Sequence, residues 1–269
     1  MITLSQTAFQ DYVPAFRDSE PRTYEAILPY MERYLRRAVD ALHVPDGFAD
    51  IPLLEAYVYR SAAYDALPHV DLVLTESGFA VVSNQNLAPA SRDRVDRLRE
   101  QLRIEKSDDR DLLLISLAQY DTWREEYGMQ LRDTLLWCPL LCRRHGITSD
   151  SGQPVYEDEF AALLMRIQRA QHLAASLISV EQMDWLLLHQ DAIDRADMRA
   201  GLCYRARNLM AAAVMERRDA VRRLTESVQD YLHRFADDLP EYRSSSKYEA
   251  DHFRGYENKQ EDNCYFFGV

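Results

Sequence analysis

The chain has 269 residues and a mass of 31.3 kDa, and 47% of its residues are apolar, which is enough material for one large domain or two smaller ones. Its formal net charge of −12 disfavours a protein that wraps DNA with its general surface, because phosphate binding needs clustered positive charge. No apolar run reaches the length of a membrane span, and the N-terminal residues lack the pattern of a signal peptide. We therefore expect a chain that folds in the cytoplasm and has no membrane partner.

Hydrophobic spacing predicts helix along most of the chain. Helical patterns follow the potential caps Ser19 and Asp50, and we expect Pro68 to end the second of these helices. Residues 112–118 are apolar on nearly every face, so their helix should lie in the core. One long helix is expected over residues 199–235.

A change of period after Pro68 predicts the one β-hairpin of the chain, over about residues 70–83. Two β-branched runs are joined by the loop 76–78, in which Gly78 takes the left-handed position. A lone two-stranded hairpin is marginal in water, so it should pack on helices or on a neighbouring subunit.

A polar segment at residues 146–154 separates two helical halves. We expect an N-terminal half over 1–146, which carries the hairpin, a second half over 147–240, and an extended arm over 241–269. Residues 242–269 include seven aromatic residues without sustained periodicity, which is typical of a segment that becomes ordered by docking. The predicted fold class is mainly α, a helical bundle with one β-hairpin insertion and an extended C-terminal arm.

Residues suited to chemistry are few. The eight glycines do not cluster, so phosphate-binding glycine motifs are missing. His172, His189 and Asp191 stand near no recognisable nucleophile motif. We therefore expect no catalytic, cofactor-binding or metal-binding residues and no enzyme. The alternative of another class is a small helical metal-binding protein or enzyme that uses Cys138, Cys142 and His145, although cysteines in an apolar segment are more often buried small hydrophobes.

Arginine is concentrated between residues 199 and 234, which hold eight arginines against four acids. The simplest interpretation is a solvated helix face whose acids pair with arginines at helical spacing. The alternatives are contact with an acidic partner surface and, in a cytoplasmic regulator, contact with nucleic acid.

Two segments resemble an uncharacterised family of prophage-type proteins whose members are similar to virion structural proteins of the head–tail junction. One is residues 67–91, LPHVDLVLTESGFAVVSNQNLAPAS, and the other is the C-terminal stretch from Tyr256 to Phe267. The resemblance covers the hairpin segment, the helix after it and the terminus, and more loosely the helical body.

The resemblance implies a head–tail connector, or adaptor, in the neck of the virion, which assembles in the host cytoplasm as a homo-oligomeric, twelve-fold ring beneath the portal. Its partners would be the portal protein and a tail or tail-completion protein, with DNA only passing through the lumen. The chain is larger than many adaptors, so a tail-completion or other neck protein is the alternative. We expect three elements to contact the portal or a neighbouring subunit: the hairpin, the arginine-rich helix and the C-terminal arm. Their contact residues are Gly78 and Phe79 in the hairpin, Arg217, Arg218, Arg222 and Arg223 in the helix, and Tyr256, Tyr265, Phe266 and Phe267 in the arm.

Overall fold

The computed structural model describes residues 2–17, 21–73 and 92–252. The chain divides into two compact units, Met1–Leu164 and Met165–Val269. Residues 147–164, which the sequence pattern places in the second half, belong to the first unit. The segment 146–154 is a loop, as expected, and contains a single bridge between Thr148 and Pro154.

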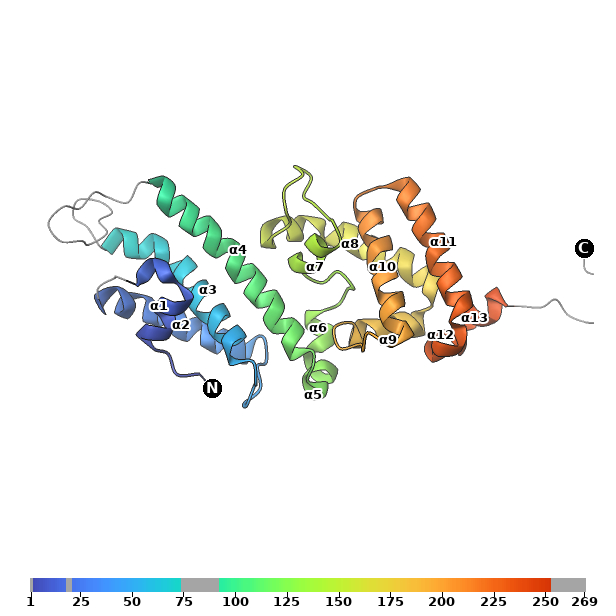
Figure 1. The fold of residues 1–269 in the computed structure, drawn as a ribbon, viewed down its shortest axis with the longest axis horizontal. Coiled ribbons are helices and arrows are strands. Elements are labelled where there is room, and N and C mark those ends of the chain that lie inside the picture. The colour runs from blue at the N-terminus through green and yellow to red at the C-terminus, as the bar shows by residue number, and fades with distance from the viewer. Residues whose placement is uncertain (1, 18–20, 74–91, 253–269) are drawn as a thin grey trace, which may run out of the picture. The chain divides into compact units, whose positions relative to one another are not determined.

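Helices make up both units (Figure 1). The first unit contains α1 (Gln6–Tyr12), η1 (Pro14–Phe16), α2 (Pro21–Asp40), α3 (Ile51–Val73), α4 (Arg92–Leu117), α5 (Asp121–Trp123), the π-helical turn η2 (Arg124–Gly128), α6 (Met129–Leu131) and α7 (Pro139–Arg144). Helix α8 (Glu157–Ile178) begins in the first unit and continues into the second. The second unit adds α9 (Val180–His189), α10 (Met198–Val214), α11 (Arg218–Arg234), η3 (Ala236–Asp238), α12 (Pro240–Arg243) and α13 (Ser246–Asp251).

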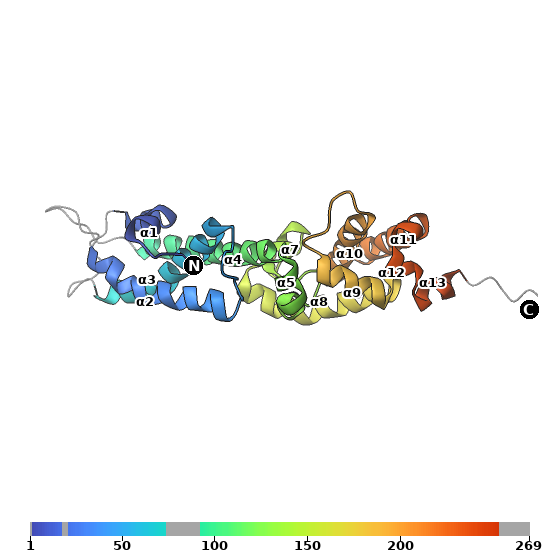
Figure 2. The same ribbon diagram turned by 90° about the horizontal axis from the view of Figure 1, so that it is seen from below.

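Helix α3 is the centre of the first unit, with α2 on one side and α4 on the other (Figures 1 and 2). Its middle is buried around nearly the whole helix, since every residue from Ala56 to Ala63 except Arg60 is buried. The small alanines let the neighbouring helices approach closely. Leu113, Leu114 and Leu117 of α4 are fully buried, as is Ala118 directly after the helix, so the core helix predicted over residues 112–118 is confirmed.

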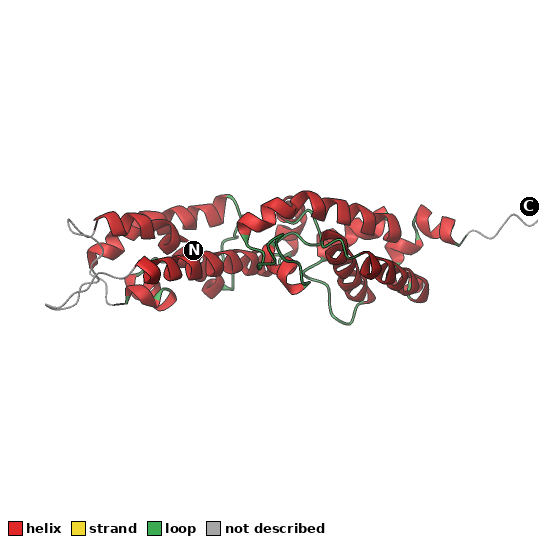
Figure 3. Cartoon of the chain, turned by 90° about the horizontal axis from the view of Figure 1, so that it is seen from above, coloured by secondary structure: helices red, strands yellow, loops and turns green. Residues whose placement is uncertain are grey.

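The predicted β-hairpin over residues 70–83 is wrong. Residues 70–73 form the last turn of α3, which continues through Pro68, and no strand occurs in the part of the chain that the structure describes (Figure 3). The β preference of Val70 and its neighbours is a weak prior that a long packed helix overrides. Gly78 and Phe79 lie outside the described residues.

The single helix predicted over residues 199–235 is also wrong, because the chain turns between α10 and α11. The turn contains neither glycine nor proline, and Glu216 has the left-handed conformation, with φ 53°. Both helices share the same hydrophobic period, so the sequence pattern shows no break there.

The extended arm predicted from residue 241 is wrong for the residues that the structure describes. Pro240 begins α12, and the Ser245 hydroxyl accepts a hydrogen bond from the Tyr248 N–H to cap α13. Tyr242 is 1% exposed and so belongs to the core of the second unit. These helices are too short to show a period, which explains the error. Tyr256, Tyr265, Phe266 and Phe267 lie outside the described residues.

Buried carboxylates hold the first unit together at the end of α4. Arg60 on α3 donates from one terminal nitrogen to both oxygens of Asp109, at 2.9 and 3.0 Å. Asp111 accepts the Leu140 N–H at 3.0 Å, which ties the start of α7 to α4. Burial raises the pKa of each carboxyl to about 6, although Arg60 partly offsets this for Asp109 and the Leu140 N–H does so for Asp111.

Replacing Asp111 should therefore change the pH dependence of stability. A folded pKa of about 6, above the unfolded value of about 4, means that the folded chain binds more protons between these values, so stability falls as pH rises through that window. Asp111→Asn removes this penalty. We expect the stability of the variant relative to the wild type to rise by about 2 kcal/mol between pH 4 and pH 7.5, measured by urea unfolding.

The control is Asp46→Asn, which changes an exposed carboxylate and should leave the pH dependence unaltered. A parallel pH dependence for Asp111→Asn and the wild type would contradict the assigned burial cost.

A close helix contact joins α10 to α11. Tyr231 donates its hydroxyl hydrogen to the Met198 carbonyl at 2.8 Å, and its ring lies over Gly201. A Cβ atom at position 201 would overlap the Tyr231 hydroxyl oxygen and lie 2.9 Å from the ring carbon Cζ. Gly201 is therefore needed for space rather than for backbone conformation.

Gly201→Ala should destabilise the chain by about 1–3 kcal/mol, because the methyl group forces Tyr231 off its site. The sign of the change in unfolding free energy separates two effects, because helix propensity alone would favour alanine over glycine by about 1 kcal/mol. Thermal unfolding followed by circular dichroism measures the change. A raised Tm would show that helix propensity outweighs the contact.

Candidate interaction surface of the second unit

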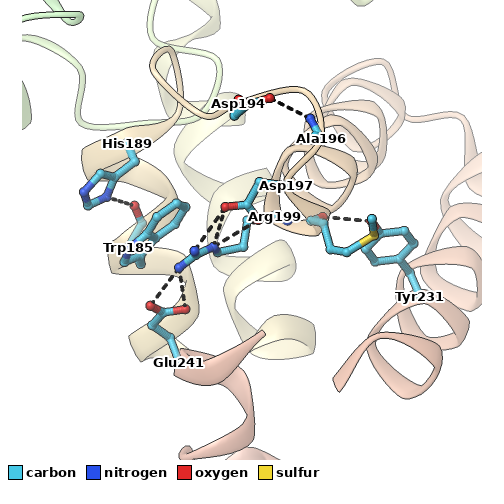
Figure 4. Close-up of polar contacts among 9 residues, drawn as sticks. Trp185, His189, Asp194, Ala196, Asp197, Arg199, Tyr231 and Glu241 are labelled. Carbon is cyan, nitrogen blue, oxygen red and sulfur yellow. Dashed lines mark hydrogen bonds and ion pairs between the residues drawn. The ribbon is translucent and has the colours of Figure 1, made fainter. Parts of the chain in front are cut away.

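One arginine joins three elements of the second unit (Figure 4). The Arg199 guanidinium carbon lies 3.9 Å from the centroid of the Trp185 ring, and the His189 imidazole stacks on the same indole at 4.2 Å with an interplanar angle of 14°. In Figure 4 the indole lies between the two. This places a planar cation against the face of the residue type that attracts cations best.

Two carboxylates complete the contact, which we call the Arg199 clamp: Trp185, His189, Asp197, Arg199 and Glu241. Arg199 binds Asp197 through Nε and Nη2, at 3.0–3.2 Å, and binds Glu241 through Nη1 at 3.1 Å. Burial alone would raise the pKa of Asp197. Hydrogen bonds from the Arg199 side chain and from its backbone N–H outweigh this effect and lower the pKa below its usual value. The ion pair therefore stabilises the fold above about pH 4 and is lost as pH falls through the lowered pKa. The clamp fastens α12 to α9 and to the start of α10.

The other arginines of α10 are also used inside the second unit. Arg205 lies over the Tyr231 ring at 4.1 Å, and Arg207 binds Asp191 at 3.1 Å and Gln190 at 3.0 Å. Asp191 is therefore an ion-pair partner. His189 bonds to the Trp185 carbonyl through Nδ1, whereas His172 is exposed on α8. The structure therefore gives no acid–base site formed by His172, His189 and Asp191 together.

The arginines at the start of α11 are arranged differently. Arg217, Arg218, Arg222 and Arg223 are all exposed. Their sole ion pair with described residues joins Arg222 to Asp219 at 3.8 Å, and both of those side chains are more than 70% exposed. This basic start of α11, Arg217 to Arg223, is therefore a surface feature, while the arginines of α10 are structural. Sequence spacing did not separate the two groups.

The comparisons with known proteins find one partial match to a family model, and that model carries no function. A model described as a family of unknown function, DUF6712, matches residues 53–113, which span most of α3 and α4. No curated protein and no solved structure matches the chain.

The alternative metal site finds no geometric support. Within residues 2–17, 21–73 and 92–252, the structure contains no group of three or more His, Cys, Asp or Glu side chains that is arranged to hold a metal ion. Cys138 and Cys142 are buried, and burial raises the pKa of the Cys142 thiol to about 12, which opposes the thiolate that a metal needs. None of the described helices is long and apolar enough to span a bilayer.

Sequence reasoning missed the Arg199 clamp. Trp185 and His189 stand four residues apart, which predicts their contact within a helix, but Glu241 lies 42 residues from Arg199. Neither motif nor period links those two positions. Only the tertiary path of α10, α11 and α12 brings them together.

Arg199→Lys should weaken the clamp although it keeps the charge. Lysine lacks the planar fork that binds two carboxylates and stacks on Trp185. We expect a loss of about 1–2 kcal/mol in unfolding free energy and faster proteolytic cleavage between η3 and α13. Arg195→Lys, at an exposed position, is the matched control and should match the wild type in both assays. Equal protection of the two variants would contradict the role of Arg199.

Proposed function

We propose that this chain is a non-enzymatic structural protein of a tailed-phage particle, a head–tail connector that assembles as a ring on the portal. The proposal combines the resemblance of residues 67–91 to virion proteins of the head–tail junction with the exposed arginines of α11. The family of unknown function matches a region that includes residues 67–91, so the resembling segment lies within a recurrent sequence unit.

The observation that carries the proposal is the basic start of α11. Four arginines surround one aspartate there, in a chain whose net charge is −12. Arg217 and Arg218 stand at the N-cap and first position of α11, where the helix dipole is also positive, so the exposed pair of Arg222 with Asp219 relieves the local repulsion only in part. An acidic surface on a neighbouring subunit or on the portal would relieve it.

The mass of the purified chain in solution tests the proposal directly. Light scattering is recorded on the chain alone and then on its mixture with the portal protein of the same particle. We expect a ring, or a monomer that becomes a ring on the portal. A monomer that ignores the portal would overturn the connector proposal.

Charge reversal tests the surface. Arg217→Glu/Arg223→Glu should weaken the assembly at least roughly tenfold, because it replaces attraction to an acidic partner by repulsion. Arg36→Glu/Arg94→Glu is the matched control: both arginines are exposed, lie in the first unit and form no ion pair with described residues. Titration of the portal followed by light scattering measures both. Equal effects of the two variants would show that only net charge matters.

A further inference from the structure

The exposed face of α11 carries an ordered series of charges. Arg218, Arg222, Glu226 and Asp230 follow one another at four-residue intervals, and all four are exposed. Residues four apart are neighbours on one face of a helix, so the series forms a continuous column that is basic in its first half and acidic in its second. We call it the α11 charge column.

The charges of the column are little used within the chain. Arg218, Glu226 and Asp230 form no ion pair with the residues that the structure describes, and Arg222 reaches Asp219 only, at 3.8 Å. Arg222 and Glu226 stand four apart, but in the order that favours pairing least within a helix. Arg234, the next residue at this spacing, lies over the ring of Phe235 at 5.4 Å.

The opposite face of α11 is already occupied. Val228, Tyr231 and Leu232 are buried in the second unit, and Tyr231 is fixed by its hydrogen bond to the Met198 carbonyl. The column consequently lies on the solvent-exposed face of α11, opposite the residues that the helix buries in its own unit.

We propose that the α11 charge column binds the same column of a second copy of this chain, with Arg218 and Arg222 of one copy against Glu226 and Asp230 of the other. The argument is charge complementarity: the two arginines and the two acids have the same four-residue spacing, so both ion pairs form in one register. This proposal rests on the proposed function. It identifies the acidic surface that binds the basic start of α11 as part of a second copy of the chain.

Two arrangements satisfy the pairing. An antiparallel second helix forms both pairs twice and closes a dimer. A second helix that runs in the same general direction, displaced by eight residues or about 12 Å, leaves half of each column free for a further copy. Such a heterologous contact closes into a ring only if neighbouring helices are also inclined to one another, because displacement along strictly parallel helices gives an open filament. Under the proposed function we expect the displaced and inclined arrangement.

The contact should be weak and sensitive to salt, because exposed ion pairs contribute little individually and are screened. Sedimentation of the full chain at high concentration should show self-association at about 25 mM NaCl that weakens at least roughly tenfold at about 500 mM. The acidic variant Arg218→Glu/Arg222→Glu and the basic variant Glu226→Arg/Asp230→Arg should each lose it.

The decisive sample is the equimolar mixture of the two variants. The acidic column of one then faces the basic column of the other, so association should return, which neither a folding defect nor net charge explains. Arg36→Glu/Arg94→Glu and Glu32→Arg/Glu125→Arg, at exposed positions of the first unit, are the matched controls and should self-associate like the wild type.

Each outcome is informative. A mixture that stays monomeric, or wild-type protein that is monomeric at low salt, overturns the α11 pairing. A closed dimer supports the pairing and contradicts the ring. Normal rings of both charge-reversed variants on the portal would overturn the pairing while the connector proposal stands.

Discussion

The cation of Arg199 is the constraint on which the second unit depends. It is held between the face of Trp185 and two carboxylates, Asp197 and Glu241, that belong to segments far apart in the chain. Because Glu241 lies on α12, which follows α11, the ion pair limits how α11 can lie against α10. The contact of Tyr231 with Gly201 then fixes the rotation of α11 about its own axis.

That rotation has a consequence for the surface. Once Val228, Tyr231 and Leu232 face inward, helical geometry places Arg218, Arg222, Glu226 and Asp230 on the outside. The charges that are exposed are therefore determined by the same contacts that form the core. A partner that binds this face requires no rearrangement of the unit, so the proposed contact is one of rigid surfaces.

The sequence predicted what depends on local pattern. It indicated the helical class, the buried helix over residues 112–118 and the loop over 146–154, because hydrophobic period and polar residues report directly on these features. It failed where tertiary packing outweighs local preference. Pro68 did not end α3, and Glu216 made a turn that lacks the usual turn residues.

The candidate surface shows the same division. The sequence showed that this region is rich in arginine, but it did not show which arginines pair within the unit and which are exposed on its surface. Arg199, Arg205 and Arg207 find ring or acid partners at the positions to which the fold brings them, whereas Arg218 and Arg223 find none among the described residues. Burying a charge costs free energy unless it is paired or hydrogen-bonded, so an arginine inside a unit needs an acid, a carbonyl oxygen or a ring face beside it. An exposed arginine has no such requirement and is free to meet the acid of another molecule. Because the chain is itself acidic, a further copy of it can supply such an acid, as in the proposed pairing of the α11 charge columns.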